Sequence, residues 1–408
     1  MRGPRSRGSG PERGGDQGIE SGERTLWLLI TALCVGGAER TLVDLANGLD
    51  PAEYDVTVWT IFSEAPLAAD LDDHLTVRSL TDSGRVENGS VVGANNPLAY
   101  VTAPLRFCYA AWAERPDVIQ SFLIFDNVVA RLAGVVCPAT IITGVRSVPN
   151  DRSLLREGLD RLTIGLADVI VSNSASGAEY ATDLGADPES VTVVRNGRDV
   201  EHYQSADATA VRAELDVGDD ELVVGTVGRL LERKGYFELL TAWCDVQTSV
   251  PNARLVLAGD GQDREELEAH AADLGCTDSV EFLGNRGDVP ELLAAMDVFA
   301  FPSHFEGLPG AVIEAMAAGL PVVATPVDGT PELLDAFRSA LFVPVEDPDQ
   351  LAWALTRALQ SPVLRRELGA AAQGDAEESF TIDAMVHGFE TVYADVLDED
   401  ARASTTVK

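Results

Sequence analysis

Short apolar runs alternate with longer amphipathic segments along the chain from residue 25 onward. The runs that we predict to be strands span residues 26–32, 56–62, 77–80, 117–121, 141–144, 168–173, 191–194, 222–227, 254–258, 280–283, 298–301 and 321–324. Helical patterns lie between most of them, for example over 41–49, 175–184 and 263–274. Nearly continuous apolar strands separated by helices are typical of parallel sheets covered on both faces. The sequence therefore predicts an α/β protein with doubly wound sheets.

The length of 408 residues suggests more than one domain. Residues 200–220 are polar and Asp-rich, and we predict that they connect a first domain, 24–199, to a second domain, 221–380. Residues 1–23 are rich in Gly, Ser, Pro and Arg and are predicted to be disordered. Residues 398–408 are predicted to form a loose tail.

One stretch, 300–325, joins a buried strand end to a predicted helix, 310–318, through a loop containing Pro and Gly. The free N–H groups within residues 308–310, of which Pro309 has none, lie at the start of that helix, where they favour an anion such as phosphate. Glu306 lies just before that position. Glu314 lies on an otherwise apolar helix, where a carboxylate that grips the vicinal hydroxyls of a ribose would make sense. A plain crossover with two solvated glutamates is the alternative that the spacing leaves open.

Two cations, Arg229 and Lys234, lie five residues apart in the loop that follows the first strand of the second domain. Lys234 and Lys408 are the only lysines, so a lysine retained here suggests a point-charge role that arginine would not fill. In the first domain, Gly36 and Gly37 follow the first strand, and adjacent glycines there let the backbone approach a ligand closely. A chance surface pair is the alternative for the two cations.

Several of these segments resemble one enzyme family. The run EGLPGAVIEAMAAGLPVVAT, from Glu306 to Thr325, resembles the Glu-x7-Glu signature of retaining glycosyltransferases of the GT-B fold, glycosyltransferase family four (glycosyl transferases group one). GR-x4-KG from Gly228, GGAER from Gly36 and NG-x-D from Asn196 are similar to further segments of that family. The resemblance covers about residues 25–397, densely in the second half and loosely in the first. It implies two Rossmann-like domains facing each other across a cleft.

The resemblance also implies a donor site in the second domain. The first glutamate of the signature, Glu306, would contact the donor sugar, and the second, Glu314, would bind the donor ribose. Arg229 and Lys234 would neutralise the donor diphosphate without a metal, so no cofactor is expected besides the nucleotide-sugar co-substrate. The backbone that meets the diphosphate would come from Leu308, Pro309 and Gly310.

Other positions follow from the resemblance more loosely. Gly36 and Gly37 would face the donor phosphates and the acceptor, and Arg286 would lie against the nucleotide base. The family often carries a histidine near the donor sugar, and our alignment places Phe125 there. The remaining expectations are that the helix 382–397 packs back onto the first domain and that acceptor or sugar contacts come from Asp126, Asn127 and Arg146.

We therefore expect an enzyme that transfers a hexosyl group, with retention of configuration, from a nucleotide-sugar to a glycan, a lipid-linked acceptor or another hydroxyl acceptor in polysaccharide biosynthesis. A non-catalytic sugar-nucleotide-binding or regulatory protein is the alternative, which the missing histidine favours. A dehydrogenase is disfavoured because the chain has no GxGxxG with an acidic ribose partner. The DxD at Asp70-Leu71-Asp72 is most simply explained by chance in so acidic a chain, and we expect no metal site.

The formal net charge of −36 changes the expected partners and environment. Such a surface repels nucleic-acid phosphates, so we expect no nucleic-acid partner. It also suggests a halophilic protein, because molar salt screens self-repulsion. The five cysteines are scattered singly and no apolar run reaches the length of a membrane span, so we expect a cytoplasmic protein. The aromatic residues Tyr100, Phe107, Tyr109 and Trp112 could dock on the cytoplasmic face of a membrane or on a lipid-linked acceptor, or simply face the core.

Overall fold

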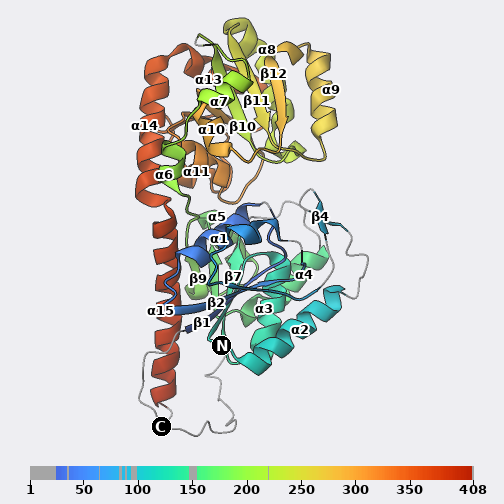
Figure 1. Cartoon of the computed structure of the whole chain (residues 1–408), viewed down its shortest axis with the longest axis vertical. Helices are drawn as coiled ribbons and strands as arrows, with labels where there is room; N and C mark the ends of the chain where they lie inside the picture. The colour runs from blue at the N-terminus through green and yellow to red at the C-terminus, as the bar shows by residue number, and fades with distance from the viewer. Residues whose placement is uncertain are drawn as a thin grey trace.

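The computed structural model describes residues 24–34, 36–63, 65–81, 85–87, 90–92, 99–146, 154–218 and 220–406. Its chain forms two lobes stacked along the long axis of the molecule, and each lobe is built on one sheet (Figure 1). The first sheet has the strand order β3-β2-β1-β6-β7-β8-β9, and the second has the order β12-β11-β10-β13-β14-β15. Neighbouring strands in both sheets are parallel. The predicted α/β architecture is confirmed.

The strands of the parallel sheet in the first domain begin and end close to the predicted positions. The strands of its parallel sheet are β1 (Arg24–Ile30), β2 (Tyr54–Thr60), β3 (Thr76–Ser79), β6 (Val118–Ser121), β7 (Thr140–Val145), β8 (Val169–Ser172) and β9 (Val191–Val193). A hairpin of β4 (Arg85–Glu87) and β5 (Ser90–Val92) lies apart from that sheet. The helices are α1 (Gly37–Gly48), α2 (Ala99–Glu114), α3 (Ile124–Val136), α4 (Leu154–Thr163) and α5 (Ala175–Asp183).

The second domain follows the same alternation. Its strands are β10 (Leu222–Val227), β11 (Ala253–Ala258), β12 (Val280–Gly284), β13 (Val298–Phe301), β14 (Val322–Ala324) and β15 (Ala340–Phe342). Its helices are α6 (Val200–Gln204), α7 (Thr209–Glu214), α8 (Tyr236–Ser249), α9 (Arg264–Leu274), α10 (Val289–Ala294), α11 (Gly310–Ala317), α12 (Thr330–Leu333), α13 (Pro348–Gln360) and α14 (Pro362–Ser379). The last helix, α15, spans Ile382–Thr406.

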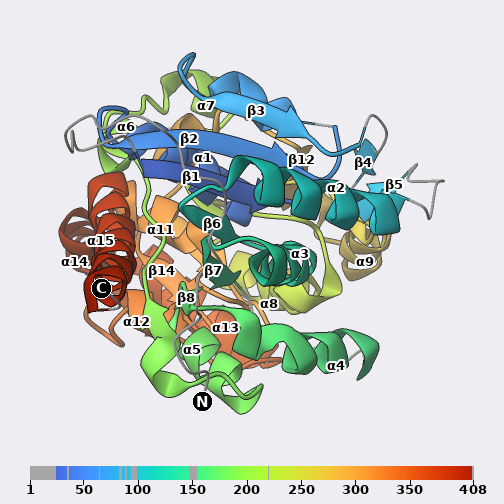
Figure 2. The same cartoon turned by 90° about the horizontal axis from the view of Figure 1, so that it is seen from below.

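Alternate residues of the central strands explain why helices cover both faces of each sheet. In β1, Leu28 packs in the core formed with α1 and α15, whereas Trp27 packs on the opposite face with Phe107 of α2. In β10, Val223 packs in the core on one face of the second sheet and Val224 packs in the core on the other face. Seen from below, α2, α3 and α4 lie along one side of the first domain (Figure 2). Strands buried on both faces account for the continuous apolar runs in the sequence.

Two segments differ from their predicted roles. Residues 200–220 are not a plain connection, because they contain α6 and α7, whose Val200 and Val211 are buried in the core of the second domain. The prediction of a loose tail over 398–408 is wrong for most of its length, because α15 continues to Thr406. No Gly or Pro follows Leu397 to stop the helix, and the segment Asp398–Ala403 contains good helix formers.

The chain crosses between the lobes twice, at neighbouring places. Arg198 N donates to Phe380 O over 2.8 Å, and Ile382 N donates to Arg198 O over 3.2 Å. After the second crossing, α15 packs on the first domain through Met385, Phe389 and neighbouring apolar residues, as the resemblance implied. Figure 1 shows α14 and α15 running one after the other along one side of both lobes.

The strand orders determine where a ligand site is expected. Each order reverses direction along the chain once, between β1 and β6 in the first sheet and between β10 and β13 in the second. Ligands of doubly wound sheets bind outside the carboxyl ends of the strands at such reversals. The loops that start at Gly228, after β10, and at Pro302, after β13, therefore occupy the expected position in the second domain.

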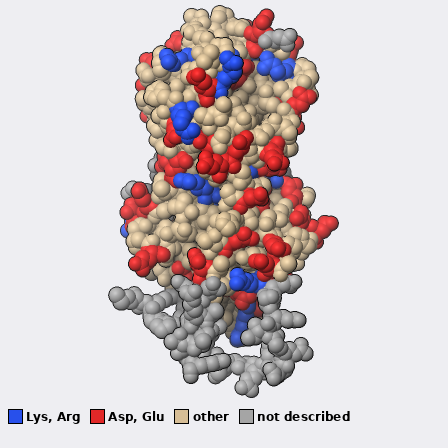
Figure 3. All heavy atoms as spheres, turned by 90° about the vertical axis from the view of Figure 1, so that its left-hand side faces the viewer, with Lys and Arg blue, Asp and Glu red and all other residues tan. Residues whose placement is uncertain are grey.

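Acidic side chains are spread over the face that carries α14 and α15, and basic ones are fewer there (Figure 3). The excess of 66 Asp and Glu over 30 Lys and Arg is therefore visible as a surface property on this side. Within the ranges that the structure describes, no helix is both long and apolar enough to cross a membrane.

Candidate functional site

Lys234 and Glu306 meet at the centre of the site. Lys234 ends a short 3-10 turn just before α8, and its Nζ donates to Oε1 of Glu306, which lies in the loop after β13. The hydroxyl of Ser303 donates to the same oxygen over 2.8 Å. Gly235 has a φ of +70°, and a Cβ there would lie 2.0 Å from the carbonyl oxygen of Pro302. Glycine is therefore required for the close approach that brings Lys234 beside the β13 loop.

The loop that carries Glu306 is held by the segment after β14. The backbone N–H of Glu306 donates to the carboxylate of Asp328 over 2.6 Å, and Thr325 Oγ1 donates to the carbonyl of Ser303. Gly329 packs so closely that a Cβ there would lie 2.3 Å from Gly307 O. These contacts fix the direction of the Glu306 side chain before any ligand binds.

Positive charge is concentrated around this carboxylate. Arg233 NH1 lies 3.7 Å from Glu306 Oε1, and burial lowers the pKa of Lys234, with the Glu306 charge acting in the opposite direction. Burial also lowers the pKa of Arg229, and the neighbouring charge of Arg233 adds to the effect. Arg229, Arg233 and Lys234 therefore lie together beside the Glu306 carboxylate, where a phosphate or diphosphate could contact them.

The first domain brings its glycine loop to this cluster. Gly36 is the N-cap of α1, and a Cβ there would lie 2.3 Å from Oε2 of Glu39. Burial raises the pKa of Glu39, whereas the charge of Arg229 in the second domain lowers it. Glu39, which follows the glycine loop, is therefore near enough to Arg229 for the two charges to interact between the domains.

The helix that follows Glu306 starts as predicted. Pro309 is the N-cap of α11, Gly310 is its first residue, and Gly319 ends it with a φ of +72°. Leu308 is buried against the core of the second domain. The backbone N–H groups at this end of α11 follow directly after Glu306 in the chain, so a bound anion could contact them and the cations together.

Glu314 lies within α11, where its Oε1 accepts a hydrogen bond of 2.9 Å from Nε of Arg198. Sequence reasoning did not single out Arg198, although NG-x-D marked its position. Ser303 was also not predicted as a site residue, because its role depends on contacts that local sequence does not show.

Asp126 and Asn127 are buried at the carboxyl ends of the central strands of the first sheet. Asp126 accepts hydrogen bonds from Thr31 N at 3.0 Å and from Thr31 Oγ1 at 2.6 Å, and burial raises its pKa to about 8. Asn127 accepts from Ser121 Oγ at 2.8 Å and donates to Gly144 O at 2.8 Å. The predicted acceptor contact is therefore not supported for either residue. Both turn inward from the first turns of α3 and join it to the sheet.

Arg146, by contrast, follows the carboxyl end of β7 and is linked to the second domain through Asn196. Its NH1 donates to Asn196 Oδ1 over 2.9 Å, and Asn196 Nδ2 in turn donates to Leu308 O over 3.4 Å. Its guanidinium carbon lies 5.0 Å from the ring centroid of Phe122, and burial lowers its pKa to about 10. Among the residues that the structure describes, its Nε and NH2 have no hydrogen-bond partner. Arg146 thus remains a candidate for an anionic group of the acceptor.

Arg286 is held by two carboxylates. Its NH2 donates to Glu214 over 2.9 Å and to Asp288 over 2.7 Å, and the other side-chain nitrogens contact the same two residues. These bonds connect α7 to the loop before α10. The predicted base contact would therefore have to form beside these ion pairs.

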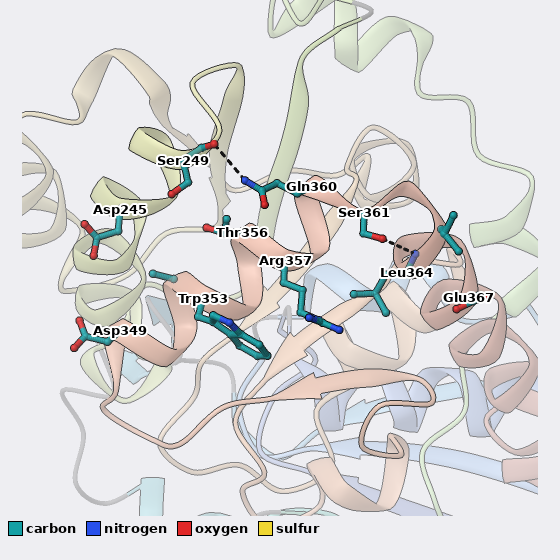
Figure 4. Close-up of a pocket in the computed structure, with 12 residues that line it drawn as sticks. Asp245, Ser249, Asp349, Trp353, Thr356, Arg357, Gln360, Ser361, Leu364 and Glu367 are labelled. Atoms are coloured by element: carbon teal, nitrogen blue, oxygen red, sulfur yellow. Dashed lines mark hydrogen bonds between the residues drawn. The ribbon is translucent and has the colours of Figure 1, made fainter.

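A separate hollow of about 760 Å³ lies between α8, α13 and α14, with Trp353 and Arg357 on one wall and Asp245 on another (Figure 4). None of the predicted site residues lines it. Elsewhere in the described ranges, no group of three or more His, Cys, Asp or Glu side chains could hold a metal ion.

Comparison with known proteins assigns both halves of the chain. Residues 35–202 match the family described as Glycosyltransferase Family 4, and residues 207–375 match the one described as Glycosyl transferases group 1. The chain is 30% identical over 405 residues to the D-inositol 3-phosphate glycosyltransferase of Acidothermus cellulolyticus, covering 91% of this chain and 88% of that protein. It is 28% identical over 358 residues to the lipopolysaccharide core biosynthesis glycosyltransferase LpsE of Rhizobium meliloti, covering 87% and 94% of the two chains.

Solved structures agree on the fold. HepE of Anabaena in complex with UDP-glucose superposes with a TM-score of 0.78 at 23% identity, covering 91% of this chain and 99% of that one. Sucrose-phosphate synthase from Thermosynechococcus elongatus gives a TM-score of 0.78 at 20% identity, covering 92% and 100%. Together with the family matches, these likenesses confirm two Rossmann-like domains in the GT-B arrangement, and the chain belongs to glycosyltransferase family four.

Proposed function

We propose that this glycosyltransferase uses a nucleotide-sugar donor and transfers a hexosyl group with retention of configuration. The observation that carries the proposal is the Lys234–Glu306 pair, buried beside Arg229 and Arg233 at the point where the second sheet reverses direction. HepE, similar in fold, was solved with UDP-glucose, which supports a nucleotide-sugar as the donor class.

The donor would lie along the β10 and β13 loops. Arg229 and Lys234 would neutralise the diphosphate, with further hydrogen bonds from the N–H groups at the start of α11. Glu306, directed by Ser303 and Lys234, would contact the donor sugar and stabilise positive charge at its anomeric carbon. Glu314 would bind the ribose. No metal is required in this scheme, because protein cations supply the charge.

In the reaction, the bond between the anomeric carbon and the diphosphate oxygen breaks, and the acceptor oxygen forms a new bond on the same face of the sugar. The proton of the acceptor hydroxyl passes to an oxygen of the departing diphosphate. Both electrons of the broken bond stay with the diphosphate, whose added charge Arg229 and Lys234 stabilise. Asp126 is fully buried, which removes it as a covalent nucleophile and favours this same-face route.

The acceptor would be a glycan or lipid-linked hydroxyl compound, held by the first domain near Arg146. LpsE acts in lipopolysaccharide core biosynthesis, which supports an acceptor of this class. Helix α2 exposes Leu105, Tyr109 and Trp112, with 54–68% of each residue accessible, although Phe107 faces the core. Exposed aromatic side chains support peripheral contact with a membrane surface at the cytoplasmic face.

The test is thermal stabilisation against UDP-, GDP-, ADP- and dTDP-sugars in molar KCl, since a bound ligand raises the melting temperature by mass action. One clear shift is expected, and it should disappear in Lys234→Ala. With that donor, Lys234→Ala and Glu306→Ala should lower turnover by orders of magnitude without unfolding, transfer should persist in EDTA, and NMR should show the donor's anomeric configuration in the product.

No shift with any nucleotide in folded protein would contradict the proposal and favour a non-catalytic protein. An inverted product would refute retention while leaving the donor assignment intact.

A further inference from the structure

Arg198 lies at the point where both chain crossings between the domains meet. Its backbone forms a parallel bridge with Thr381 and hydrogen-bonds Phe380 and Ile382 on either side of it. A Cβ at Gly197 would lie 2.3 Å from Thr381 O, so the two crossing segments are in direct contact. The Arg198 backbone therefore has a fixed position relative to both domains.

The side chain of Arg198 is buried, and it reaches both domains from that position. On the second-domain side, Nε donates to Glu314 Oε1 over 2.9 Å, while NH1 donates to Gly197 O over 2.8 Å. On the first-domain side, NH1 lies 4.0 Å from Oδ2 of Asp44 in α1. A Cβ at Gly310 would lie 2.2 Å from NH2, so the guanidinium also packs against the first residue of α11.

These contacts constrain Glu314 strongly. Its side chain is 17% exposed, and a carboxylate so little hydrated needs a charged or hydrogen-bonding partner. Arg198 supplies that partner through Oε1. No hydrogen bond to the second oxygen of Glu314 is seen in the described part of the chain, so that oxygen is the one available to a ligand hydroxyl.

We infer that Arg198 is a positioning residue for the nucleotide ribose: it holds one oxygen of Glu314 and thereby directs the other toward the ribose hydroxyls. This inference rests on the proposed function, in which Glu314 is the ribose ligand. Because the same guanidinium approaches Asp44, the orientation of Glu314 also depends on how closely α1 of the first domain lies against the crossing.

The geometry makes the effect specific to the ribose. The diphosphate is assigned to Arg229, Lys234 and the start of α11. Arg198 packs against Gly310 there, whereas its side-chain hydrogen bonds in the described part of the chain go to Glu314 and Gly197. Loss of the Arg198 charge near the phosphates should weaken binding of a nucleotide and of its dideoxy analogue alike, so the ratio of the two affinities reports on the ribose hydroxyls alone. An unspecific loss of structure would weaken both equally.

The experiment compares two probes: whichever of UDP, GDP and ADP stabilises the protein most, and its 2′,3′-dideoxy analogue. Dissociation constants are measured by calorimetry for wild type, Arg198→Gln and Arg198→Lys. Wild type should bind the ribose nucleotide about tenfold or more tightly than the dideoxy analogue, which is the ratio of dissociation constants expected for hydrogen bonds to a charged group. Arg198→Gln should reduce the preference to below about threefold, and Arg198→Lys should restore part of it.

Arg195→Gln is the matched control, since Arg195 lies in the same segment but is exposed. This variant should prefer the ribose form over the dideoxy analogue as strongly as wild type does. If Arg198→Gln does not fold, the double variant Asp44→Asn/Arg198→Gln replaces it. In that variant Asp44 is neutral, so only Glu314 is left without the cation that it faces in wild type. An unchanged preference in folded Arg198→Gln, or in that double variant, overturns the inference. Absence of any preference in wild type would instead overturn the assignment of Glu314 to the ribose.

Discussion

Asp126→Asn is the substitution whose effect on stability follows most directly from the structure. Asp126 is fully buried, and its pKa is raised from 3.8 to about 8, mainly by burial, with the charge of Glu39 adding to the effect. In the native state its carboxyl group is therefore protonated at neutral pH. Asparagine has the same shape and is always neutral, and it can accept from Thr31 N while donating to Thr31 Oγ1.

The sign of the pH dependence follows from proton binding. Between pH 4 and 8 the native carboxyl holds a proton that the unfolded chain has released, so wild-type stability falls as the pH rises through this window. The slope for one proton is about 1.4 kcal/mol per pH unit, and the whole shift corresponds to about 6 kcal/mol. Asp126→Asn lacks this dependence. Its free energy of unfolding should therefore rise relative to wild type by about 4 kcal/mol from pH 5 to pH 8.

Urea unfolding at constant KCl, followed by fluorescence of the buried Trp27 and Trp59 in the same domain, measures this difference at each pH. A difference between variant and wild type that stays constant from pH 5 to 8 would refute the reasoning. Turnover at pH 7 should remain within a few-fold of wild type. A hundredfold loss in a folded variant would instead show that Asp126 contacts substrate, as the sequence had suggested.

Two further predictions concern the glycine at the site and the acidic surface. Gly235→Ala should lower turnover strongly, because its Cβ would clash with Pro302 O and displace Lys234. Gly275→Ala, with nearly the same φ of +72° but no atom within 4 Å of the added Cβ, should cost only about 1 kcal/mol of stability and leave turnover unchanged. The melting temperature should rise from low to molar KCl, because salt screens the repulsion within a chain of net charge −36. A melting temperature that does not change with salt would contradict the halophilic hypothesis, and equal turnover in the two alanine variants would contradict the packing argument.

The strands were predictable because their apolar runs end at residues that stop strands. The predicted spans 222–227 and 298–301 match β10 and β13, which are followed closely by Gly228 and Pro302. The helix 310–318 and its terminal Gly319 were predictable for the same reason, since α11 has distinct start and stop signals.

The burial of candidate residues was not predictable in the same way. Asp126 is satisfied by Thr31, and Arg198 is satisfied by Glu314, in each case from a distant part of the sequence. Local sequence contains no signal for such pairs. The family resemblance led to Glu306 and Lys234, but Arg198 stands at the unspecified position of NG-x-D, where a resemblance gives no information.

The return of α15 to the first domain means that neither folding unit corresponds to one continuous piece of chain. A fragment that ends at residue 199 would lack Met385, Phe389 and Tyr393, which fill one face of the first sheet, and would expose that apolar surface to water. During synthesis on the ribosome, the first domain cannot complete its core until residues 385–393 of α15 have emerged. The second domain can fold earlier, because its own core residues end at Phe380. The first domain then completes its core when α15 packs onto its sheet.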